Sequence, residues 1–194
     1  EARVYAQLPR NELPAEATLH GRVHGPRCVY ARSLTSSVRL VDRGPGNTLL
    51  AEAIVPDPCF WTPALPYLYQ IETELHIAGE VVERTQRELG IRPLGRRGKR
   101  FMYDGRPWVA RGVDINRVTD PQWFVWREQE AIMICDAPDE AFLQQADEHG
   151  YLLAVQIRNG QALGEQIARL ARHPSVGFVV LASSANIDNS VRRG

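Results

Sequence analysis

Residues 58–77 read PCFWTPALPYLYQIETELHI, and this stretch decides how the first half of the chain is interpreted. Pro58, Pro63 and Pro66 restrict the backbone around two large aromatic rings, which is typical of a rigid corner. The following residues alternate, with Leu68, Ile71, Leu75 and Ile77 set against Gln70, Glu72, Glu74 and His76. This period is typical of a half-buried strand. The stretch therefore predicts a corner that leads into a strand over residues 67–77.

Further strand-like segments lie on both sides of this corner. We expect them at residues 17–24, 28–41 (with a bend at Ser36-Ser37) and 48–55, and again at 81–91 after the Gly79-Glu80 turn. Glycine and proline separate these segments at short intervals. Such spacing predicts an antiparallel β-sandwich.

The pattern changes after a basic, glycine-rich stretch at residues 92–100, which we interpret as a solvated linker. A hairpin follows around Asp104-Gly105. Helical segments at 121–130, 138–149 and 161–172 then alternate with short apolar strands at 131–135, 151–157 and 176–182. We expect Asp120 to cap the first helix and Gly150 to end the second. This order predicts βαβ units with a parallel sheet, and a domain boundary that divides residues 1–94 from 95–194.

The composition excludes several classes of function. Basic and acidic residues number 23 each, so bulk charge gives no support for nucleic-acid binding or for binding to a membrane surface. The apolar runs are too short to span a bilayer. Cys28, Cys59 and Cys135 lie far apart in the sequence and are interpreted as buried thiols. His20 and His24 would be ~13 Å apart on a strand, so they cannot bind the same metal ion. We expect no metal and no cofactor, and the compartment stays open.

Five segments resemble, in the same order, the motifs of glycoside hydrolase family 2. They are the corner at 58–69, Gly90-Ile91-Arg92, the stretch FMYDGRPWVARG at 101–112, Asp147-Glu148-His149-Gly150, and His173-Pro174-Ser175-Val176. The resemblance covers residues 17–182. It implies an immunoglobulin-like sandwich followed by the first half of a (β/α)₈ barrel.

The resemblance also implies a chemistry. Enzymes of this family are retaining β-glycosidases that act on galactosides, glucuronides or mannosides. Two glutamates carry the reaction, the acid/base on the fourth barrel strand and the nucleophile on the seventh, with carboxyl groups about 5–5.5 Å apart.

The sequence departs from the family where the acid/base is expected. Reading without gaps from His173, the family's Asn-Glu pair falls on Ser183 and Ser184, and with a short insertion it falls on Asn186 and Ile187. Neither Ser184 nor Ile187 can protonate a leaving group. The strand of the nucleophile would lie beyond the end of this chain, and Gln156 stands where the family usually has an acid.

Asp114 and Asn116 are the candidate remnants of a sugar site, because they follow the first barrel strand and lie two residues apart. The alternative is that both cap the approach to the next helix. Trp123 and Trp126 share a helix face, and could stack on a sugar or pack the helix on the sheet.

Four βα units leave an apolar inner face and open edges, so we expect an open α/β layer, a homodimer through the half barrel, or a longer natural chain. The predicted function is a glycoside hydrolase family 2-like protein without catalytic residues, with a role in carbohydrate binding or assembly. One alternative is a fragment of a retaining β-glycosidase that sequence outside this chain completes. Another is a protein-interaction module.

Overall fold

The structure of the chain is a computed structural model that describes residues 1–6, 14, 16–44, 50–158 and 162–181. The chain forms two compact units. The first comprises Glu1–Cys59 and Tyr67–Ile91, and the second comprises Phe60–Pro66 and Arg92–Gly194. The corner at residues 60–66 thus belongs with the second unit although strands of the first precede and follow it. The division into domains at residues 94 and 95 stays a prediction.

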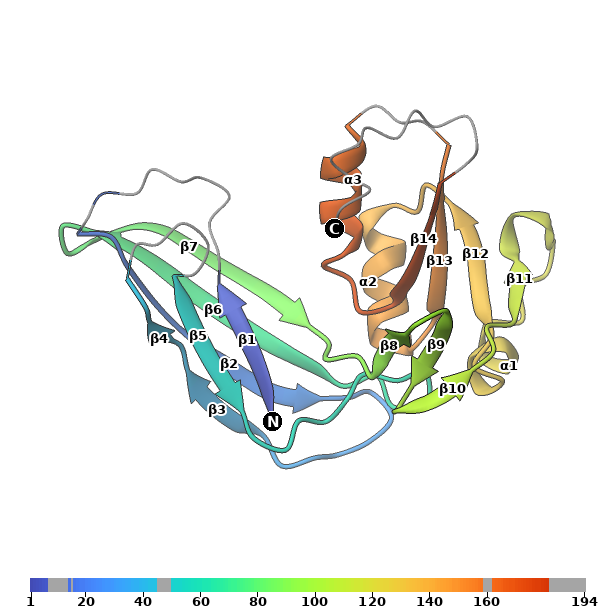
Figure 1. The fold of residues 1–194 in the computed structure, drawn as a ribbon, viewed down its shortest axis with the longest axis horizontal. Coiled ribbons are helices and arrows are strands. Elements are labelled where there is room, and N and C mark those ends of the chain that lie inside the picture. The colour runs from blue at the N-terminus through green and yellow to red at the C-terminus, as the bar shows by residue number, and fades with distance from the viewer. Residues whose placement is uncertain (7–13, 15, 45–49, 159–161, 182–194) are drawn as a thin grey trace. The chain divides into compact units, whose positions relative to one another are not determined.

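Two antiparallel sheets make up the first unit (Figure 1). The first sheet has the order β3-β2-β6-β7, with β3 at Ser36–Arg39, β2 at Thr18–Arg27, β6 at Leu68–Ile77 and β7 at Glu80–Leu89. The second has the order β1-β5-β4, with β1 at Ala2–Ala6, β5 at Ala51–Val55 and β4 at Val41–Asp42. Each pairing within the two sheets is antiparallel.

The core of the first unit draws on both sheets. Val4 and Ala53 come from the second sheet, and Leu19, Val23 and Leu75 come from the first. Side chains of two sheets that share one buried core define a sandwich. This part of the fold prediction is confirmed.

Three local predictions for this unit need correction. Residues 28–35 form no strand, so the expected strand at 28–41 is reduced to β3 and β4. Strand β1 was missed, although Val4 points inward and Tyr5 outward as a half-buried strand requires. The sequence placed Leu68 and Leu75 on the same face of β6. Because strand side chains alternate, Leu75 shares the core face with Tyr69, whereas Leu68 lies on the opposite face, where it is also buried.

A parallel sheet dominates the second unit, in the order β11-β12-β13-β14. The strands are β11 (Gly112–Asp114), β12 (Ile132–Asp136), β13 (Leu152–Ile157) and β14 (Val176–Leu181). A 3₁₀ turn at Ile115–Arg117 and helices α1 (Trp123–Glu128), α2 (Glu140–His149) and α3 (Leu163–Leu170) connect them. Helices α2 and α3 cover one face of the sheet, where Leu143 and Leu170 share a core with Met133 and Leu153 (Figure 1).

The basic stretch at residues 92–100 is not a linker. It contributes to a three-stranded antiparallel sheet, β8-β9-β10, formed by β8 (Leu94–Arg97), β9 (Arg100–Tyr103) and β10 (Arg106–Trp108). On one side of this sheet the rings of Phe101 and Trp108 contact Phe178 of β14, with centroid distances of 5.0 and 6.2 Å. Phe178 lies beside Ala154 in the parallel register, and residues of this parity face away from the helix-covered core. The small sheet therefore covers part of the helix-free face.

The helix ends follow the expected rules in α2 but not in α1. Asp139 caps α2 by accepting a hydrogen bond from the amide of Phe142 at 2.8 Å, and Gly150 ends it in the left-handed conformation. Helix α1 begins after Gln122, whose side chain makes no capping bond, so the prediction that Asp120 is the cap is wrong. One residue, Pro121, separates Asp120 from the cap position.

The predicted fold class, an antiparallel sandwich followed by a partial parallel βα layer, is confirmed. In the part of the chain that the structure describes, no helix is long and apolar enough to cross a membrane.

Gly150 generates the first testable prediction, because its position is restricted in two ways. Its φ is +78°, and a Cβ added there would lie 2.3 Å from the backbone oxygen of Pro63 in the corner. We expect Gly150→Ala to lower the free energy of unfolding by about 3 kcal/mol in urea denaturation. Gly98 is a matched control, since its φ is +61° and nothing lies within 4 Å of the added Cβ. Gly98→Ala should cost about 1 kcal/mol, and equal losses would contradict the contact with the corner.

Candidate functional site

Charged and polar side chains gather where the strands of the parallel sheet end. Asp114 is the last residue of β11, Asp136 is the last of β12, and Arg158 directly follows β13. The carboxyl ends of parallel strands meet at one edge of the sheet, which is where α/β folds commonly bind ligands. We refer to Asp114, Asn116, Asp136 and Arg158 as the carboxyl-edge cluster.

Hydrogen bonds connect the cluster from strand to strand. Asp114 Oδ1 accepts hydrogen bonds from the backbone amide and the side-chain amide of Asn116, at 3.1 and 2.9 Å. Asp114 Oδ2 pairs with Arg117 Nε at 3.0 Å. The Oδ1 of Asn116 in turn accepts a hydrogen bond from the backbone amide of Asp136 at 3.3 Å. The turn after β11 is thereby tied to the end of β12.

The carboxylate of Asp136 has two oxygens in different situations. Arg158 donates to Oδ2 from both Nε and Nη2, at 3.0 and 2.7 Å. The other oxygen, Oδ1, is buried and has no hydrogen-bond partner among the described residues. A buried acceptor without a donor is costly, and a ligand hydroxyl or a bound water that entered when the edge of the sheet opened would satisfy this oxygen.

The structure brings the predicted site residues Asp114 and Asn116 together with Asp136, which the sequence did not suggest as a site residue. Asp114 caps the 3₁₀ turn, so the capping interpretation describes its present contacts, while Asn116 reaches the neighbouring strand. The pairing of Asp136 with Arg158 was missed. Its signal in the sequence was that an acid and a base stand at equivalent ends of two consecutive predicted strands.

The other positions that the sequence singled out add no described side-chain contact to the carboxyl-edge cluster. Gln156, found where the family usually has an acid, lies directly beside Asp136 in the register of β12 and β13. Ser184 and Ile187, the two candidate positions of the lost acid/base, lie outside the described residues. Their assignment stays a prediction.

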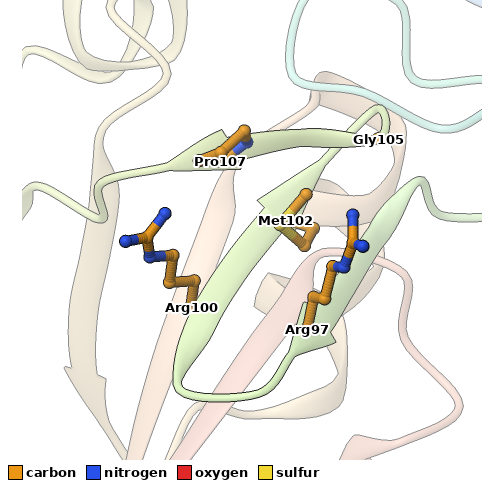
Figure 2. Close-up of a pocket in the computed structure, with 5 residues that line it drawn as sticks. All are labelled: Arg97, Arg100, Met102, Gly105 and Pro107. Carbon is orange, nitrogen blue, oxygen red and sulfur yellow. The ribbon is translucent and has the colours of Figure 1, made fainter.

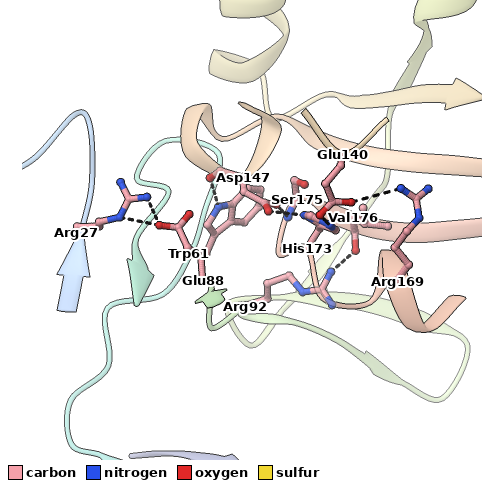
Figure 3. A network of polar contacts seen from close by, with 10 residues as sticks. All are labelled: Arg27, Trp61, Glu88, Arg92, Glu140, Asp147, Arg169, His173, Ser175 and Val176. Carbon is pink, nitrogen blue, oxygen red and sulfur yellow. Dashed lines mark hydrogen bonds and ion pairs between the residues drawn. The ribbon is translucent and has the colours of Figure 1, made fainter. Parts of the chain in front are cut away.

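A second polar cluster lies deep in the same unit and centres on Asp147 (Figure 3). Asp147 Oδ2 lies 2.7 Å from Nδ1 of His173, and Oδ1 accepts the backbone amide of Ser175 at 2.9 Å. The backbone oxygen of Asp147 accepts a hydrogen bond from the indole of Trp61 at 2.8 Å. Asp147 and His173 are only 5% and 7% exposed, which shows that both ionisable groups are held away from water.

This buried network also fixes the corner at residues 60–66. Arg127 is buried, and its guanidinium donates to the backbone oxygens of Pro63 and Ala64 at 2.7 and 3.0 Å. Trp61, 2% exposed, contributes the indole already described. The side chain of Arg127 in α1 and the backbone of Asp147 in α2 thus hold the corner, so Trp61 has a structural role.

The buried cluster contains serine, histidine and aspartate but lacks the geometry of a catalytic triad. In a triad the serine hydroxyl is hydrogen-bonded to the imidazole of the histidine. Here the hydroxyl of Ser175 is buried without a hydrogen-bond partner among the described residues, and Ser175 is 0% exposed. The second nitrogen of His173 instead lies 3.2 Å from Glu140. The cluster is therefore structural, with His173 held between Glu140 and Asp147.

The two tryptophans of α1 pack against other aromatic rings rather than forming an exposed surface on which a sugar could stack. The ring of Trp123 lies 5.6 Å from that of Tyr151, 5.7 Å from Phe142 and 5.9 Å from Trp126. These rings border the core beneath α2 and α3. Of the two interpretations of the tryptophan pair, helix packing is the one that these contacts support.

The thiols and histidines provide no metal site. Cys135 is buried, and burial together with the charge of Asp136 raises the pKa of its thiol to about 11. Cys28 and Cys59 are only half-buried, which corrects the expectation of three buried thiols, because both flank the irregular segments at 28–35 and 59–66. Within the described ranges no three histidine, cysteine or acidic side chains converge on a common point.

Comparison with known proteins identifies relatives of the chain. The sequence model described as Glycosyl hydrolases family 2 matches residues 3–92. A beta-galactosidase of Oenococcus oeni is 30% identical over 107 residues, which cover 54% of this chain and 10% of that protein. The chain thus spans about a tenth of the length of this relative.

Two solved structures share the fold. A glycosyl hydrolase family 2 member from Bacteroides cellulosilyticus has a TM-score of 0.58 at 17% identity, covering 88% of this chain and 26% of that one. A Bacteroides uniformis beta-glucuronidase has a TM-score of 0.51 at 21% identity, covering 84% and 24%. At these identities the likeness shows the fold alone.

The buried histidine generates a prediction on pH. Burial of His173 opposes its charged form, but the hydrogen bond and charge of Asp147, with the charge of Glu140, raise its pKa above the ordinary value. A raised pKa stabilises the folded state below the unfolded value of about 6.5, and this contribution is lost as pH rises through the folded pKa. We expect the stability lost in His173→Gln to be larger at pH 5.5 than at pH 8.5.

Denaturation of both proteins in urea across this pH range tests the prediction. Ser175→Ala is the matched control, since it removes a hydroxyl without a described partner and leaves the ion pair intact. Its stability should stay within about 1 kcal/mol of the parent at both pH values. A loss in His173→Gln that is the same at every pH would contradict the ion pair.

Proposed function

Because this chain belongs to glycosyl hydrolase family 2, we propose that it has a carbohydrate-related binding role at the carboxyl edge of its parallel sheet and does not hydrolyse glycosides by itself. The ligand class comes from the names of its relatives, which are a beta-galactosidase and a beta-glucuronidase. The location comes from the geometry of the carboxyl-edge cluster. The sugar, the partner and the lack of catalysis are all parts of the proposal.

The observation that carries the proposal is the unpartnered oxygen of Asp136. Its Oδ1 is buried and lacks a donor in the described part of the chain, while Arg158 holds Oδ2. Sugar hydroxyls are donors as well as acceptors. A hydroxyl that donates to Oδ1 would satisfy a buried charged acceptor, an interaction worth about 1.5–3 kcal/mol. Asn116 and Arg158 beside it offer further polar contacts.

The residues available for proton transfer support the non-catalytic part. Ser184, or Ile187 in the alternative register, stands where the family's acid/base is expected, and neither can deliver a proton to a leaving group. The two carboxylates of the described edge, Asp114 and Asp136, are each paired with an arginine. An acid that protonates a glycosidic oxygen must instead carry its proton toward the substrate.

A second candidate is a fragment of a retaining β-glycosidase that other sequence completes. The short span favours it, since the chain corresponds to about a quarter of the solved structures it resembles. The parallel strands β11–β14 would then be the first half of a (β/α)₈ barrel. Recovery of hydrolysis on adding a longer chain would favour this candidate.

Assembly is the other role within the proposal. Val180 on β14 shares the parity of Phe178, lies on the helix-free face of the sheet and is 44% exposed. Pairing of two copies through this face would cover it. Sedimentation velocity should then show a dimer, which Val180→Asp would dissociate, and a monomer at high concentration would exclude the pairing.

The binding proposal makes a specific prediction for Asp136. We expect methyl β-galactoside to bind saturably, as measured by heteronuclear NMR titration, and Asp136→Asn to weaken the binding about tenfold because a charged acceptor is lost. Asp104→Asn is the control, since Asp104 lies in the β9–β10 turn with a φ of +48°, which asparagine tolerates. No saturable shift near Asn116 and Arg158 with any methyl β-glycoside would overturn the proposal.

Hydrolysis is tested separately with aryl β-glycosides. We expect no turnover above the buffer rate. Turnover that Asp114→Asn or Asp136→Asn abolishes would show that an acid in this chain has taken over catalysis, and the non-catalytic part would be wrong.

A further inference from the structure

Two arginines face an open hollow on the three-stranded sheet, away from the carboxyl-edge cluster. Arg97, Arg100, Met102, Gly105 and Pro107 line this hollow, whose volume is about 380 Å³ (Figure 2). In the register Arg97 lies directly opposite Arg100, and Met102 lies opposite Pro107. Figure 2 shows Met102 between the two arginines, which stand on either side of it. The hollow therefore has an apolar floor with a guanidinium at each side.

The charge of the hollow is not balanced by the protein. Residues 92–111 contain seven basic residues and one acid, Asp104, in a chain whose total charge is zero. Among the described residues neither Arg97 nor Arg100 forms an ion pair or a side-chain hydrogen bond, and both are exposed. Nine other arginines in the described part do form ion pairs or bonds to backbone oxygens. They are Arg3, Arg27, Arg43, Arg84, Arg92, Arg117, Arg127, Arg158 and Arg169.

The position of the pair is fixed by the opposite face of the sheet. Phe101 lies between Arg100 and Met102 in β9 and packs on Phe178, so the alternation of the strand directs its two neighbours away from Phe178. Cross-strand neighbours on one face have Cβ atoms about 4.5–5.5 Å apart. Two guanidinium groups rooted so close together repel each other, and an anion between them would remove that repulsion.

We propose that this hollow binds the oxyanion of an acidic saccharide, a carboxylate or a sulfate ester, at a site separate from the carboxyl-edge cluster. Guanidinium groups recognise such oxyanions by paired hydrogen bonds. The apolar floor of Met102 and Pro107 suits the C–H face of a sugar ring, and the volume is at the lower end of the range for small-ligand sites. The saccharide part of this inference rests on the proposed function, whereas the oxyanion part rests on the arginine pair.

The test compares galacturonate with galactose, which differ at the carboxylate, by NMR titration of the whole chain. We expect galacturonate to shift the resonances of residues 97–107 saturably and galactose to leave them unchanged. The double variant Arg97→Gln/Arg100→Gln should weaken galacturonate binding at least about tenfold. Arg106→Gln is the matched control, because Arg106 lies opposite Tyr103 on the other face of the sheet. The affinity of this variant for galacturonate should stay within about twofold of the parent's. Added salt should weaken the interaction.

Several outcomes would overturn the proposal. One is the absence of saturable shifts at residues 97–107, and another is binding that the double variant retains. Binding of inorganic sulfate or of an oligoglutamate without binding of galacturonate would assign the hollow to a different ligand. Asp136→Asn separates the two proposals, because it should weaken neutral-sugar binding at the carboxyl edge about tenfold and leave galacturonate binding at the hollow unaffected.

Discussion

The carboxylate and backbone of Asp147 are the point on which the second unit depends. Its two carboxylate oxygens engage His173 and the amide of Ser175, which open the last described strand, and its carbonyl holds Trp61 of the corner. Through one residue, α2 is thereby joined to two segments that are far from it in sequence, the corner and residues 173–175. A buried carboxylate is costly to leave unpaired, so these contacts are mutually required: each partner reduces the cost of burying the charge, and each is positioned by it.

The two edges of the parallel sheet use polar groups differently. Around Asp147 both carboxylate oxygens have partners, the buried His173 and the backbone amide of Ser175, as expected of an edge that serves stability. At the opposite edge, Asp136 retains a buried oxygen without a described donor, and the contacts of Asp114 come from its own turn. This contrast follows the general division of βα folds, in which ligands are bound at the carboxyl ends of the strands.

The sequence predicted elements best where the period was strong and the signals local. The extent of β6, the glycine end of α2 and the Asp104-Gly105 hairpin all appear as expected, because each depends on neighbouring residues. Predictions failed where tertiary contacts decide. Residues 92–100 looked like a charged linker, yet they pair as strands because the other face of that sheet packs on Phe178. In the site, Asp114 and Asn116 could be named from the resemblance, whereas the Asp136–Arg158 pair depends on the strand register.

The membership of residues 60–66 in the second unit has an evolutionary consequence. The backbone passes between the two units after Cys59, after Pro66 and after Ile91. Recombination at a single junction therefore cannot separate the sandwich cleanly from the second unit. A transplanted sandwich would carry Trp61 and Pro63 without Asp147 and Arg127, the groups that hold them. A single cut between the two units would therefore leave the corner without its supports, so we expect the two halves of this chain to be inherited together.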